Sequence, residues 1–86
     1  MTETRIIRFY ATKWCPDCIR ARKLLDSLNV PYEYIDVNQD KEARQYVEKV
    51  NRGNCSVPTI IFPDDSILIE PSNAALSEKL IEMKLI

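Results

Sequence analysis

The sequence predicts an α/β fold, a four-stranded mixed sheet flanked by three helices in the order β-α-β-α-β-β-α. Two observations lead to this prediction. Short runs rich in β-branched and aromatic residues alternate with longer runs whose apolar residues recur at helical spacing. A helix separates the first two strands, which makes them parallel, whereas a short turn separates the last two and makes them antiparallel.

The first strand and the first helix lie on either side of a cysteine pair. The strand is an apolar, β-branched run over about residues 5–10. Proline cannot continue a helix and restricts the residue before it, so Pro31 ends the helix, which covers about residues 15–28. Its expected buried face consists of Ala21, Leu24, Leu25 and Leu28.

The middle of the chain adds a second strand and a second helix. Aromatic and β-branched residues predict the strand at about residues 32–37. Residues 38–40 supply N-cap candidates for a helix over about residues 41–51. Gly53, the only glycine, is predicted to cap the end of this helix in the left-handed conformation. The expected buried face consists of Ala43, Tyr46, Val47 and Val50.

The last third of the chain contains two short strands and a helix. The strands are expected at about residues 58–62 and 67–69, joined by a turn at 63–66. Ser72 is the predicted N-cap of the final helix. The expected buried side of that helix consists of Leu76, Leu80 and Met83.

Length and composition indicate one small globular domain over residues 1–86. No segment approaches the roughly 18 apolar residues of a membrane span, and the N-terminus opens into a strand rather than an apolar signal core. We therefore expect a cytoplasmic protein with no membrane partner. Three cysteines are an odd number for a disulfide scaffold, and with no histidine a zinc site would need a carboxylate or water ligand.

Charge is distributed unevenly along the chain. Residues 1–23 carry a net charge of +4, and the remainder carries −5. The positive part holds the cysteine pair, where it favours a thiolate and attracts anionic partners. The alternative interpretation is a solvated helix face. The acidic remainder and the lack of interleaved aromatic residues disfavour nucleic-acid binding.

The run Trp14-Cys15-Pro16-Asp17-Cys18 carries the chemistry. Two intervening residues let a short turn bring both sulfurs within disulfide reach. The start of a helix offers unpaired N–H groups and partial positive charge to the first sulfur, which favours the thiolate that attacks disulfides. We expect Cys15 to be the exposed nucleophile and Cys18 the more buried resolving thiol. The alternative is a structural disulfide or a metal clip.

Three landmarks in this order resemble the glutaredoxins. They are the run 14–18 after the first strand, Ser56-Val57-Pro58-Thr59 before the third, and a capped helix after the fourth. Within that family the chain resembles the mycoredoxin branch. The resemblance implies a thioredoxin fold and a glutaredoxin-type disulfide oxidoreductase that needs no cofactor. It also implies a cis bond before Pro58, which faces the cysteine pair, and backbone pairing of Val57 with the substrate.

Four departures from the family pattern bear on the partner thiol. Asp17 stands where glutaredoxins have tyrosine, Thr12 where they have lysine, and Cys55 where they have arginine. Residues 69–73 replace a glycine-rich motif that holds glutathione. The expected co-substrate is therefore a low-molecular-weight thiol such as glutathione or mycothiol. Direct reduction by a thioredoxin-type flavin reductase is the competing hypothesis.

Cationic residues are candidates for contacts with the carboxylates of a peptide thiol. Lys13 and Arg44 are the two that we select, and Arg20 and Arg22 are further candidates. Most surface cations, however, bind nothing specific.

The other candidate residues each have two interpretations. Trp14 directly precedes the nucleophile and is predicted to contact partners; the alternative is a core tryptophan. Ser72 and Asn73 lie where free N–H groups at a helix start can hold a carboxylate, although Ser72 can equally be a plain cap. Cys55 is expected to be a partly buried small hydrophobe, and the alternative is a regulatory thiol that bonds to Cys15.

The sequence as a whole predicts a monomeric thiol–disulfide oxidoreductase. Its partners are a small thiol and proteins that carry disulfides or mixed disulfides with small thiols. Three alternatives remain: an electron donor of thioredoxin type, an iron–sulfur cluster carrier that uses Cys15 from two chains, and a redox-inactive metal-handling module with Cys15 and Cys18 as soft ligands.

Overall fold

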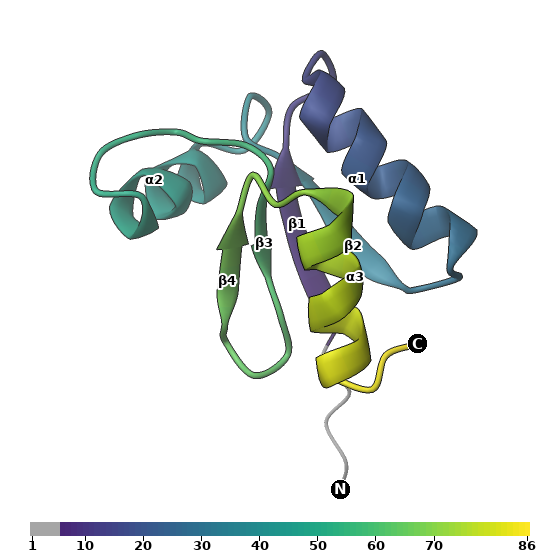
Figure 1. Cartoon of the computed structure of the whole chain (residues 1–86). Coiled ribbons are helices and arrows are strands. Elements are labelled where there is room, and N and C mark those ends of the chain that lie inside the picture. The colour runs from purple at the N-terminus through teal and green to yellow at the C-terminus, as the bar shows by residue number, and fades with distance from the viewer. Residues whose placement is uncertain (1–5) are drawn as a thin grey trace, which may run out of the picture.

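The helices and strands follow the order that the sequence predicts. The structure is a computed structural model and describes residues 6–86. Arg5, the expected first residue of the first strand, lies outside the described residues. The elements, labelled in Figure 1, are β1 (Ile7–Ala11), α1 (Pro16–Ser27), β2 (Tyr32–Asp36), α2 (Lys41–Val50), β3 (Thr59–Ile61), β4 (Ile67–Ile69) and α3 (Asn73–Glu82).

The four strands form one mixed sheet in the order β2-β1-β3-β4. β1 and β2 are parallel, with Phe9 opposite Tyr34, and β3 and β4 are antiparallel, with Ile60 opposite Leu68. Both orientations are as predicted from the connections. β1 also pairs antiparallel with β3, so it is a central strand with a neighbour on each side. Its carboxyl end, at Ala11, leads directly into the loop that carries the cysteine pair.

Two apolar clusters lie on the two faces of the sheet. α1 and α3 cover one face, where Phe9 and Phe62 are almost wholly buried. α2 covers the other face, where Tyr10 and Val47 are buried. This division follows from the strand period of two, which points Phe9 and Tyr10 of β1 to opposite sides. Cys18 belongs to the first cluster, so the dithiol motif is part of the core.

The buried faces predicted for the three helices are confirmed, except at the C-terminal end of α1. Ala21 and Leu25 of α1 are fully buried, as are Leu76 and Leu80 of α3. Leu28, expected in the core, is instead 37% exposed, because α1 ends at Ser27 and Leu28 is only its C-cap. Ala43 and Val47 of α2 are also buried. The other members of the expected faces are half-buried: Leu24, Tyr46, Val50 and Met83.

The expectation that Gly53 adopts the left-handed C-cap of α2 needs correction. The residue after the C-cap Asn51 is Arg52, which has a φ of 57°. The N–H of Gly53 donates to the carbonyl of Glu48, and the N–H of Arg52 donates to that of Lys49. These two bonds form a Schellman motif with Arg52, and not the glycine, at its left-handed position. Gly53 also has a positive φ, of 99°, one residue further on.

No helix among residues 6–86 is long and apolar enough to span a membrane.

Replacing Arg52 by glycine should stabilise the protein. A side chain in the left-handed region costs about 1–2 kcal/mol, and part of the gain is lost because glycine gives the unfolded chain more freedom. We expect Arg52→Gly to raise the free energy of unfolding, measured by urea titration, by about 0.5–1 kcal/mol. Lys49→Gly, inside the last turn of α2, should lower it by about 1 kcal/mol. Equal effects of the two substitutions would contradict the assigned cap.

Candidate active site

Cys15 occupies the N-cap of α1, at the point where the chain leaves β1. Its Sγ accepts a hydrogen bond from the backbone N–H of Cys18 at 3.2 Å, which is the N-cap contact of this helix. Pro16 follows at the first helical position, where a missing N–H leaves nothing unpaired. Cys15 is half-buried and its thiol is free. The first sulfur of the pair is therefore oriented by the helix start and is reachable from solvent.

Cys18 lies one turn further along α1 and is only 1% exposed. It packs in the same cluster as Ala21 and Leu25. Burial, followed by hydrogen bonding to Cys15, raises the pKa of the Cys18 thiol to about 12. Cys18 is therefore a protonated thiol at neutral pH, and it differs from Cys15 in exposure as the sequence predicts.

The loop before β3 lies against the dithiol. The Val57–Pro58 peptide bond is cis, as expected. The thiol of Cys15 faces the backbone carbonyl of Val57, with 3.7 Å between sulfur and oxygen. Thr59 is wholly buried; its hydroxyl donates to the carbonyl of Ser56 at 2.7 Å and accepts from the side-chain amide of Asn51 at 3.2 Å. These bonds tie the loop to the end of α2.

Two residues beside the nucleophile project into solvent. Trp14 is 87% exposed, so it is not a core tryptophan. Lys13 is also exposed. Their roles in partner binding stay predictions.

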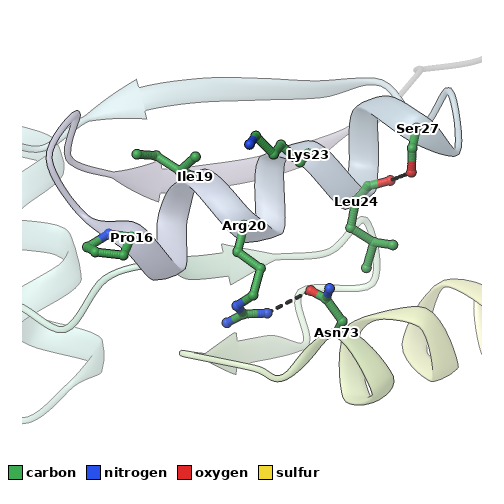
Figure 2. Close-up of a pocket in the computed structure, with 7 residues that line it drawn as sticks. All are labelled: Pro16, Ile19, Arg20, Lys23, Leu24, Ser27 and Asn73. Atoms are coloured by element: carbon green, nitrogen blue, oxygen red, sulfur yellow. Dashed lines mark hydrogen bonds between the residues drawn. The ribbon is translucent and has the colours of Figure 1, made fainter.

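Arg20 makes a contact that the sequence did not reveal. Its guanidinium donates to the side-chain oxygen of Asn73 at 2.6 Å (Figure 2). It also donates to the carbonyl of Pro71 at 3.1 Å. It also forms an ion pair with Asp17 at 3.4 Å. Arg20 thus joins the dithiol helix to the start of α3, where Ser72 caps the helix through its hydroxyl. A side-chain bridge across more than 50 residues leaves no local sequence signal.

The other cationic candidates differ in position. Arg22 lies over the ring of Tyr34, 4.2 Å from its centroid, and donates to the hydroxyl of Tyr32. It fastens α1 to β2, and its role in binding a substrate carboxylate stays a prediction. Arg44 is exposed and contacts Asn38 and Glu48, both close to it in sequence. Among the described residues, no contact of Arg44 reaches the dithiol.

Cys55 is half-buried and packs against the cluster beneath α2. This agrees with the expected small hydrophobe and leaves its redox role open to experiment.

The comparisons with known proteins assign this arrangement to a family. The glutaredoxin family model matches residues 7–67, which include the Cys15–Cys18 pair and the cis-proline loop. The chain belongs to the glutaredoxin family. Mycoredoxin 1 of Corynebacterium glutamicum is 40% identical over 74 residues, which cover 86% of this chain and 91% of the relative. The resemblance to the mycoredoxin branch is thus confirmed.

Solved structures agree with this assignment. A mutant of the thioredoxin-like protein BC3987 superposes with a TM-score of 0.76 at 30% identity, and the match covers 86% of this chain and 97% of the mutant. A glutaredoxin from Archaeoglobus fulgidus superposes with a TM-score of 0.68 at 26% identity, covering 84% and 82%. The fold is therefore the thioredoxin fold, and this glutaredoxin is a disulfide oxidoreductase.

Glutaredoxins act together with glutathione-like thiols and use no prosthetic cofactor. In the part of the chain that the structure describes, no three or more Cys, His, Asp or Glu residues gather where a metal ion could be held.

The Cys18 thiol should resist ionisation in the folded protein. Burial disfavours the charged thiolate, so the proton is retained well above the ordinary cysteine pKa of about 8.5. In a variant with Cys15 and Cys55 replaced by serine, we expect no thiolate absorbance between about pH 7 and about pH 10. A variant without any cysteine supplies the tyrosine background. The first variant unfolded in urea should titrate at about pH 8.5. Titration of the folded variant at that same pH would contradict the role of burial.

Proposed function

We propose that this glutaredoxin reduces protein disulfides, and mixed disulfides between proteins and small thiols, through the Cys-Pro-Asp-Cys dithiol. The observation that carries the proposal is the asymmetry of the pair. Cys15 is half-exposed and its sulfur accepts an N–H at the start of α1, whereas Cys18 is buried and protonated. One sulfur is suited to attack an incoming disulfide, and the other to attack only what has already bound to the first.

The reaction has two exchanges. The thiolate of Cys15 attacks one sulfur of the substrate disulfide, and the other substrate sulfur leaves as a thiolate that takes up a proton. The sulfur of Cys18 then loses its proton and attacks Sγ of Cys15, releasing the second substrate thiol. Two electrons pass to the substrate, and a Cys15–Cys18 disulfide forms. Two molecules of a reduced small thiol reverse these steps on the enzyme and leave as their own disulfide.

Substrate binding is proposed at three places around Cys15. The backbone of Val57, beside cis-Pro58, pairs with the substrate residue that carries the attacked sulfur. The exposed ring of Trp14 covers the apolar part of the substrate next to that residue. Lys13 and Arg44 attract carboxylates. For Arg44 this requires its exposed pair with Glu48, 3.5 Å long, to open, and such pairs contribute little.

Ser72 and Asn73 form the third place, at the N-terminus of α3. The hydroxyl of Ser72 already satisfies the N–H of Ala75, and Arg20 fixes the side-chain oxygen of Asn73. A carboxylate would therefore use the remaining N–H groups of the first turn.

The small thiol is proposed to be glutathione or mycothiol. Similarity to mycoredoxin 1 supports mycothiol. The replacement of a family arginine by Cys55 also argues against a site made for glutathione.

Residues 1–86 are proposed to act as a single monomeric domain in the cytoplasm. A thioredoxin-type reductase is the alternative source of electrons.

Separate reductants offered to the oxidised protein will identify this partner. Glutathione, mycothiol, and NADPH with a thioredoxin reductase are each incubated with the Cys15–Cys18 disulfide, and reduction is followed by the mass gain of two hydrogen atoms. We expect reduction by mycothiol at least about tenfold faster than by glutathione, a difference of about 1.4 kcal/mol in activation free energy. A Cys55→Arg variant, which restores the family residue, should narrow that difference. Reduction by the reductase alone would refute a small-thiol partner.

A further inference from the structure

α1 carries a second stripe of residues beside its buried face, and Leu24 of this stripe also packs against the core. Cys18, Ala21 and Leu25 form the buried stripe. The second stripe recurs at the same helical spacing, and Arg20 in the middle of it contacts Asn73 of α3. It lines an open groove of about 700 Å³, shown in Figure 2, to which Pro16, Ile19, Arg20, Lys23 and Leu24 contribute.

The groove combines apolar surface with positive charge. Pro16 is exposed, Ile19 is 42% exposed and Leu24 is half-buried. The guanidinium of Arg20 is held at the Asn73 side, and the ammonium of Lys23 makes no ion pair with any described residue. The nearest acid in sequence, Asp26, accepts a hydrogen bond from the hydroxyl of Tyr32 at 2.9 Å, and Asp17 is paired with Arg20. Lys23 is therefore the cation that is free to attract an acidic group.

The groove starts next to the reactive sulfur. Pro16 directly follows Cys15, and Lys23 and Leu24 lie two turns along the helix, about 10–12 Å away at 1.5 Å per residue. About three or four extended residues are enough to span this distance. A substrate segment whose cysteine is bound to Cys15 can therefore reach Lys23 and Leu24 with its next few residues. The groove therefore lies within reach of any protein segment that the enzyme is reducing.

We propose that this groove docks an acidic, partly apolar segment of the protein whose disulfide Cys15 attacks. Leucine-like side chains of the segment pack on Ile19 and Leu24, and its carboxylates approach Lys23 and Arg20. A second copy of this chain is a poorer occupant, because a two-fold contact would bring the same cations face to face. The proposal rests on the dithiol mechanism above and adds a protein-binding surface to it.

Two synthetic peptides test the docking. Each carries one cysteine in a mixed disulfide with nitrothiobenzoate and a tail of six residues, alternating Glu and Leu in one peptide and Gln and Leu in the other. Reduced enzyme should release the coloured thiolate from the Glu peptide at least about threefold faster than from the Gln peptide at low salt. The difference should vanish at about 1 M salt, where charges are screened.

Matched variants locate the effect. Lys23→Glu should abolish the preference for the Glu peptide, whereas Lys49→Glu, the same charge change on α2, should keep most of it. Ile19→Ala should lower the rate of thiolate release from both peptides by about threefold. Ile81→Ala, at an exposed position on α3, should change neither rate. A small uncharged disulfide, hydroxyethyl disulfide, should react at one rate with all four variants. Equal rates for the two peptides, or equal effects of Lys23→Glu and Lys49→Glu, would overturn the proposal.

Binding without chemistry separates docking from catalysis. A Glu peptide with serine in place of its cysteine, titrated into isotope-labelled protein, should shift the backbone NMR signals of Ile19, Lys23 and Leu24. Shifts confined to other surfaces would overturn the docking proposal even if the dithiol is active. Shifts at α1, combined with no reaction of any disulfide, would support docking and contradict the dithiol mechanism.

Discussion

The placement of the Cys15 sulfur at the N-cap of α1 is the constraint on which the site depends. The N–H of Cys18 holds the sulfur from one side, and the carbonyl of Val57 faces it from another. The helix cannot rotate to change this, because Cys18, Ala21 and Leu25 are almost fully buried on its inner face. The packing of these three side chains in the core therefore determines which of the two thiols is exposed to solvent.

The segments around that sulfur are joined by contacts between distant parts of the chain. The N–H of Glu70 donates to the carbonyl of Pro58, and Arg20 donates to the carbonyl of Pro71. The cis-proline loop, the start of α3 and the first turn of α1 are thus linked in a ring around the dithiol. Arg20 serves both this ring and the outer groove, which makes the groove continuous with the site. Arg20 and Lys23 bring positive charge to the groove, and Lys13, exposed two residues before Cys15, brings it to the dithiol.

Local patterns in the sequence predicted most of the fold and the two cysteines. The helical spacing around Ala21 and Leu25, the cap Ser72 and the short connections were sufficient for element order and strand direction. Helix ends were harder, since Arg52 takes a left-handed position that residue preference assigns to Gly53. Arg20 and Arg22 look alike in sequence, yet one bridges to α3 and the other stacks on Tyr34. Only the packing of α1 against two different neighbours distinguishes them.

The most direct test of this account is to trap the first exchange. A Cys18→Ser variant receives one equivalent of the disulfide of nitrothiobenzoate, and the adduct is located by peptide mass mapping. The account predicts one stable mixed disulfide on Cys15, since the resolving thiol is absent, while Cys55 stays free. An adduct on Cys55 with Cys15 unreacted would contradict it, as would an adduct on Cys18 in the companion Cys15→Ser variant.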